Sequence, residues 1–103
     1  MRFILIAVLL YPFVARADDY MLIIKDHQFQ PTELTVPAGA KIKLTVANQD
    51  ATPEEFDSYA LNREKVISGH GTATIYIGPL NAGSYPFVGE FHSDTAKGVV
   101  IAK

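Results

Sequence analysis

Polar and apolar residues alternate with a period of two along several short segments after residue 17. Lys41–Val46 and Thr72–Ile77 show this alternation most clearly. A period of two is typical of a strand that buries one of its faces. Other short segments are rich in strand-forming residues and are bounded by turn residues. These further predicted strands are Tyr20–Lys25, Glu33–Val36, Glu54–Ser58, Lys65–Ile67, Ser84–Val88 and Gly98–Ala102.

The spacing of these segments predicts the fold class. Seven or eight short strands, about ten residues apart, favour an all-β sandwich with Greek-key connections. A sustained 3.6-residue period is missing from this part of the chain, and only Tyr59–Glu64 has room for a helical turn. We therefore expect one domain over residues 18–103, with a core of modest size.

The first 17 residues have the pattern of a secretory signal peptide. Arg2 is followed by the apolar run Phe3–Val14, which is too short to cross a bilayer. Ala15-Arg16-Ala17 fits the small-x-small rule for cleavage. We expect residues 1–17 to be removed and the domain to be exported to the periplasm.

Composition narrows the chemistry of the domain. The chain has no cysteine, so it can form neither a disulfide nor a metal–thiolate bond. Without Arg2 and Arg16, 9 − 2 = 7 basic residues remain against 11 acidic ones, a formal charge of −4. A net-negative domain without a basic stripe argues against nucleic acid as a partner.

The segment Tyr85–His92, with the closing strand near Gly98–Ala102, resembles the C-terminal ligand segment of the cupredoxins. That family reads Tyr-x-Phe-x-Cys-x-x-His at this point, with a methionine shortly after. Here Gly89 stands at the cysteine, His92 at the histidine and Ala96 near the methionine. The resemblance implies a cupredoxin-like sandwich without a blue-copper centre.

The other histidine position of the cupredoxins corresponds to Glu54 or Glu55, after the turn Asn48-Gln49-Asp50. Adjacent residues of a strand face opposite ways, so both glutamates cannot point inward without a bulge. Alignment on the cupredoxin histidine favours Glu54. Alignment on the iron-related motif described next favours Glu55, and we lean slightly towards Glu55.

Glu55-Phe56-Asp57 and Gly89–His92 resemble the EfeO-type cupredoxin-like group, as does Gly78-Pro79-Leu80. This resemblance implies a role in periplasmic iron uptake. The implied partners are an inner-membrane iron permease and other periplasmic uptake components.

Carboxylates and imidazoles at these positions suit iron or Cu(II) better than Cu(I). His27 follows the first predicted strand and could complete the site, and Asp94 could orient His92. His70 lies between two glycines, and we expect it in an exposed loop. The candidate metal ligands are Glu54, Glu55, Glu90, His92, His27 and Asp94.

These residues favour a metal-binding protein of an iron-uptake system, for which assistance to Fe(II) oxidation is the one reaction that we consider. Hydrolytic catalysis has no support, because the chain has no cysteine nucleophile and no Ser-His-Asp order with its usual local motif. One alternative is a protein-interaction module without a metal. Another is a copper-binding electron-transfer or delivery protein, although the absence of cysteine argues against a Cu(I) site.

Overall fold

The computed structural model describes residues 18–103, and in this range the chain is an all-β domain. Nine strands and one short 3-10 helix follow one another along the described chain. Their bounds are β1 Asp18–Lys25, β2 Gln28–Gln30, β3 Glu33–Val36, β4 Ile42–Asn48, β5 Glu54–Ser58, β6 Arg63–Ile67, β7 Thr72–Ile77, β8 Gly83–Gly89, η1 Glu90–His92 and β9 Lys97–Ala102.

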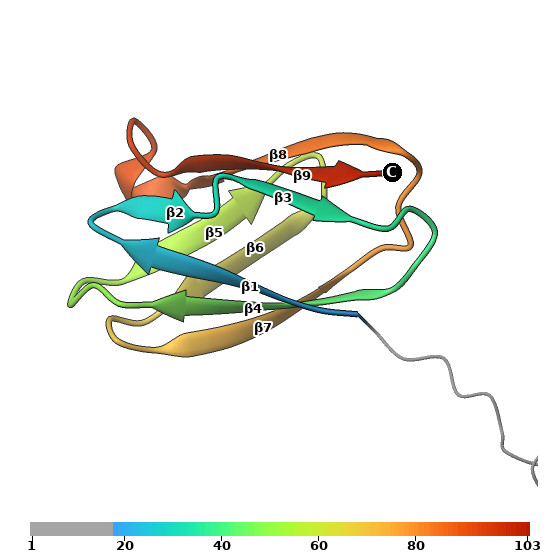
Figure 1. The fold of residues 1–103 in the computed structure, drawn as a ribbon. Coiled ribbons are helices and arrows are strands. Elements are labelled where there is room, and N and C mark those ends of the chain that lie inside the picture. Colours follow the sequence, from blue (N-terminus) through green and yellow to red (C-terminus); the bar gives the residue numbers. More distant parts are fainter. Residues whose placement is uncertain (1–17) are drawn as a thin grey trace, which may run out of the picture.

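The strands form two sheets that pack face to face (Figure 1). One sheet has four strands in the order β2-β1-β4-β7, and the other has five in the order β3-β9-β8-β5-β6. β1 runs parallel to β4, and β3 runs parallel to β9, whereas the remaining neighbours are antiparallel. This arrangement confirms the predicted class of an all-β sandwich.

The core lies between the inward faces of the two sheets. Along β4 the buried positions alternate with half-buried ones, as the sequence pattern predicts. Three aromatic rings, those of Phe29, Phe56 and Phe87, form a cluster with centroids 4.9 to 6.2 Å apart. Rings at such distances pack favourably in edge-to-face or offset geometry. Because Phe56 and Phe87 each lie two residues from a site position, the cluster anchors the strand ends that carry Glu54 and Gly89.

The predicted strands are all present, with ends that differ by one or two residues. Two elements were not expected, namely β2 and η1. The helical turn considered for Tyr59–Glu64 is a single turn, in which the Asn62 N–H donates to the Tyr59 carbonyl over 3.1 Å. β6 already begins at Arg63, because its first residues pair with the end of β5.

The predicted signal peptide, residues 1–17, lies outside the described residues. Within residues 18–103, no helix is long and apolar enough to cross a membrane.

Candidate metal site

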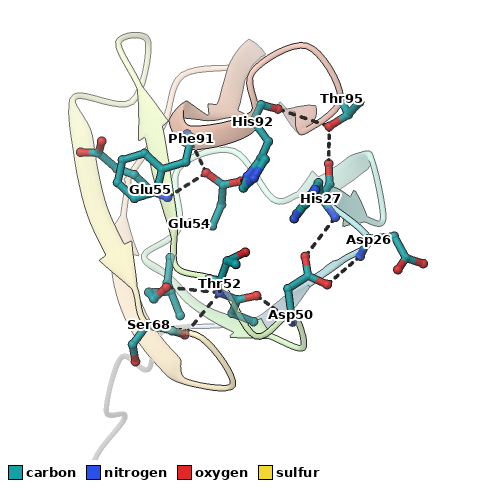
Figure 2. A network of polar contacts seen from close by, with 12 residues as sticks. Asp26, His27, Asp50, Thr52, Glu54, Glu55, Ser68, Phe91, His92 and Thr95 are labelled. Carbon is teal, nitrogen blue, oxygen red and sulfur yellow. Dashed lines mark hydrogen bonds and ion pairs between the residues drawn. The ribbon is translucent and has the colours of Figure 1, made fainter.

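The candidate residues that approach one another lie at a single end of the sandwich, on the left in Figure 1. Three segments meet there: the β1–β2 turn, the β4–β5 loop with the start of β5, and η1 with the loop that leads to β9. Hydrogen bonds link the three segments, and Figure 2 shows this network.

Glu54 is the buried centre of the site. Its side chain points inward with Phe56 and Ser58, and only 1% of the residue is exposed. One carboxylate oxygen, Oε1, accepts the backbone N–H of Glu55 at 2.9 Å and that of Phe91 at 2.8 Å. The other, Oε2, lies 2.7 Å from Nδ1 of His92. A buried carboxylate with three such partners is well compensated for its loss of water.

The Glu54 carboxylate fixes the orientation of the His92 ring. An ionised carboxylate can only accept hydrogen bonds, so Nδ1 of His92 carries the proton and donates it. In the neutral imidazole, Nε2 then keeps its lone pair. The His92 side chain is 27% exposed, against 2% for Glu54. The ring therefore has one nitrogen held in the interior and the other available for a ligand.

The His27 ring stacks on the His92 ring. Their centroids are 3.6 Å apart and their planes differ by 8°. His27 comes from the β1–β2 turn, whereas His92 ends η1, so two distant parts of the chain place the two imidazoles together (Figure 2). Imidazole nitrogens are common ligands of Zn, Cu, Fe and Ni.

The β1–β2 turn that carries His27 is held by side chains from two other segments. Asp26 and His27 both have positive φ, 54° and 57°, which is uncommon for residues other than glycine. The Asp50 carboxylate accepts both of their backbone N–H groups, at 2.8 and 3.0 Å. Thr95 Oγ1 donates to the His27 carbonyl over 2.7 Å. These contacts fix the position of His27.

The same contacts alter the acidity of Asp50. The hydrogen bond from the His27 N–H is the largest influence and lowers the pKa of Asp50, burial opposes it, and the Asp26 N–H adds a smaller lowering, so that the pKa is lowered on balance. The carboxylate is therefore stabilised in its charged form by the turn that it holds.

Asn48 in turn holds the loop that carries Asp50. Its buried side chain accepts the Asp50 N–H at 3.0 Å and donates to the Thr52 carbonyl at 2.9 Å. It also lies 3.3 Å from the carbonyls of Ile67 and Ser68. From the sequence we read Asn48-Gln49-Asp50 only as a turn before the position of the cupredoxin histidine. The known tendency of Asn and Asp to bind nearby backbone groups is the signal that could have indicated this role.

The structure corrects the choice between the two adjacent glutamates. Our slight preference for Glu55 as the inward residue was wrong: Glu54 points inward, and Glu55 is half-buried on the opposite face of β5. The ladder explains the difference, since Phe56 faces the core opposite Gly89, and Glu54 lies two residues from Phe56 on the same face.

Glu55 belongs instead to an acidic outer surface. Partial burial raises its pKa, and the charges of Glu64, Asp57 and Glu90 raise it further. Glu90 and Asp94 are both exposed. The six predicted ligands therefore do not gather at one point, and within residues 18–103 no three His, Cys, Asp or Glu side chains form an arrangement that could hold a metal ion.

His70 is exposed in the β6–β7 turn, as the flanking glycines predict. Like His27 it has a φ of 57°, and its N–H donates to the Asp50 carbonyl over 2.8 Å.

The blue-copper ligand set does not fit the residues present. Such a site needs a thiolate with two imidazoles, and the chain has no cysteine. The space beside Gly89, the position that corresponds to the thiolate, is filled by the Glu54 carboxylate. Any metal at this end of the sandwich must be bound in another way.

Comparisons with known proteins agree with the fold. Residues 2–102 match the family model of the cupredoxin-like domain. The chain is 43% identical over 83 residues to an uncharacterized protein, RP394, of Rickettsia prowazekii (strain Madrid E), and the match covers 81% of this chain and 66% of the relative.

Several solved structures are similar to this chain in fold. Auracyanin A of Chloroflexus aurantiacus, a "blue" copper protein, has a TM-score of 0.74 at 16% identity, covering 85% of this chain and all of the other. Amicyanin of Paracoccus versutus has a TM-score of 0.65 at 20% identity, covering 86% and 85%. A purple cupredoxin of Nitrosopumilus maritimus has a TM-score of 0.62 at 18% identity, covering 81% and 98%. At these identities the likeness is one of fold alone. The match of residues 2–102 to the family model shows that this chain belongs to the cupredoxin-like family.

Proposed function

We propose that this protein binds a divalent metal ion at the exposed edge of the His27–His92 pair, with Glu54 holding His92 in the orientation that binding requires. The observation that carries the proposal is the bond between Glu54 Oε2 and His92 Nδ1, which leaves Nε2 beside the stacked ring of His27. Metal-binding histidines in proteins commonly donate their other ring N–H to a carboxylate in this way.

His92 Nε2 and one ring nitrogen of His27 would be the protein ligands, and water would complete the coordination. One ring must rotate, because parallel rings direct their lone pairs along parallel lines rather than at one point. Of the first-row divalent ions, Cu(II) generally binds such nitrogen sites most tightly. The cupredoxin-like fold is compatible with copper, and Cu(II) is therefore the ion that we propose first.

Iron is the finer proposal that rests on the resemblance to the EfeO-type group. In that setting the protein would be periplasmic, would bind iron near Glu54 and His92, and would pass it to an inner-membrane permease. The support comes from sequence motifs alone, whereas auracyanin A, one of the structural neighbours, is described as a copper protein. Iron is accordingly the second ion to test.

A metal-free interaction module is the second candidate function. It is favoured by the internal pairing of Glu54 with His92, since a buried carboxylate and imidazole that satisfy each other need no metal to close the site. The metal titration below also decides between these two candidates.

The test is calorimetric titration of the purified, metal-free protein with Cu(II) and, under anaerobic conditions, with Fe(II). We expect saturable binding of one ion per chain. His92→Ala and His27→Asn should each weaken binding more than about tenfold, because even the loss of an outer partner of a ligand commonly costs about 10–100-fold. Asparagine tolerates the positive φ at position 27.

His70→Asn is the matched control, because His70 has the same φ as His27 and lies in a neighbouring turn. This variant should bind like the wild type. Binding that is absent in the wild type would contradict the metal site and favour the interaction module, and so would binding that survives both site substitutions.

A further inference from the structure

The backbone at Gly89 does not require glycine for its conformation. Its φ of −93° and ψ of 107° lie in the extended region that any residue can adopt. A different constraint must therefore explain why a larger side chain is absent at the end of β8.

The constraint is space. A Cβ atom at position 89 would lie 2.7 Å from Cδ and 2.8 Å from Oε2 of Glu54, and 2.7 Å from Cβ of Ala96. Contacts below 3.0 Å require a neighbour to move. Glu54 cannot move freely, because its oxygens are held by two backbone N–H groups and by His92. The side chain of Glu54 thus occupies the volume into which residue 89 would extend.

We infer that the residue types at positions 54 and 89 depend on each other. The Glu54 side chain stands where the fold family has a metal ligand, and it also fills the space that a side chain at position 89 would need. The carboxylate joins β5 to η1 in the interior, as a bound metal ion would. It also excludes a soft thiolate centre, because a cysteine at position 89 and a glutamate at position 54 need the same space. Glu54 is therefore the residue that determines which kind of metal site this end of the fold can form. The inference holds whether or not a metal binds at the outer histidines.

The first test is a double-mutant cycle on the unfolding of the full-length protein. Gly89→Ala should destabilise the wild type, because the added methyl group meets the fixed carboxylate. In the Glu54→Ala background, Gly89→Ala should change the unfolding equilibrium constant at least about tenfold less than in the wild type. The effects of substitutions at two residues in contact are not additive. Ala96→Gly serves as the matched control background, because it removes only the close contact between a Cβ at position 89 and Cβ of Ala96. Additive effects of the substitutions at 54 and 89 would overturn the inference.

The second test uses a spectroscopic signal that a purely structural role would not produce. With Cu(II), Gly89→Cys in the Glu54→His background supplies two imidazoles and a thiolate, the ligand set of blue copper. It should develop an intense visible absorption from the copper–thiolate bond, whereas Gly89→Cys with Glu54 retained should not. Equal absorption in the two variants, or none in either, would overturn the role of Glu54 in excluding this centre. Neither result depends on the binding measured at His27.

Discussion

Residue by residue, the site depends on polar side chains that bind the backbone of other segments. Glu54 and Asp50 each accept two N–H groups, and Asn48 bonds to the backbone of its own loop and of the β6 end. The bonds to the two carboxylates are charge-assisted and therefore stronger than those between neutral groups. The two histidines are therefore positioned by residues that need not touch a metal.

Asp50 makes stability depend on pH in a predictable direction. Its pKa is lowered in the folded state, so its contribution is present above the ordinary value of 3.8 and is lost as the pH falls through the folded-state value. Asp50→Asn should therefore destabilise the protein at pH 7, and the difference from the wild type should shrink below about pH 4. Urea unfolding at a series of pH values measures this difference.

Asp94→Asn is the control for that series, because Asp94 is exposed and lies on the loop that also carries Thr95. Its difference from the wild type should stay small over the same range. If Asp50→Asn lowers the free energy of unfolding equally at pH 7 and pH 3, the role given to the two N–H bonds is contradicted.

At the scale of elements, β5 separates two chemical environments. Its inward residues include Glu54 of the site. Its outward residues form an acidic surface with β6, in which Asp57 lies directly across the ladder from Glu64. Partial burial and these like charges raise the pKa of Glu55. Its charged form is therefore disfavoured by folding, and the resulting penalty is present at neutral pH and absent well below its ordinary value of 4.5.

Glu64→Gln should lower the pKa of Glu55, because it removes the charge that raises this pKa most. NMR titration of the Glu55 carboxyl carbon measures this shift, and added salt should reduce it by screening. Glu33→Gln, on β3 at the far edge of the same sheet, should leave the Glu55 titration unchanged. A Glu55 pKa that is the same with and without Glu64 would contradict this account of the acidic surface.

The elements were predictable from the sequence where their pattern was regular. The alternation in β4 and β7 indicated both strands, because a buried face imposes a period of two. β2 has only three residues, too few to show a period, and η1 forms where Glu54 captures the Phe91 N–H from another strand. The sequence likewise pointed to Glu54, Glu55 and His92, but the inward glutamate follows from the β5–β8 register, which depends on pairing between distant segments.

At the scale of the whole molecule, the protein combines a cupredoxin-like sandwich with a site closed by an internal hydrogen bond between His92 and Glu54. The domain has no disulfide, and its core of aliphatic residues and three phenylalanines lies beneath the site. Glu54 and His92 join β5 to η1, so protein contacts connect the elements at this end of the sandwich. A metal would instead bind at the outer edge, where Glu54 already orients His92 and a rotation of one ring would bring the two imidazoles onto the ion.

Substitution of Glu54 by glutamine tests this account most directly. In Glu54→Gln the side-chain oxygen must still accept the two backbone N–H groups, so the amide NH₂ faces His92 and Nδ1 has to become an acceptor. The proton then moves to Nε2, which loses the lone pair that a metal needs. The measurement is the Cu(II) affinity of folded Glu54→Gln against the wild type by calorimetry. We predict binding about 10–100-fold weaker in the variant, and equal affinities would contradict the account.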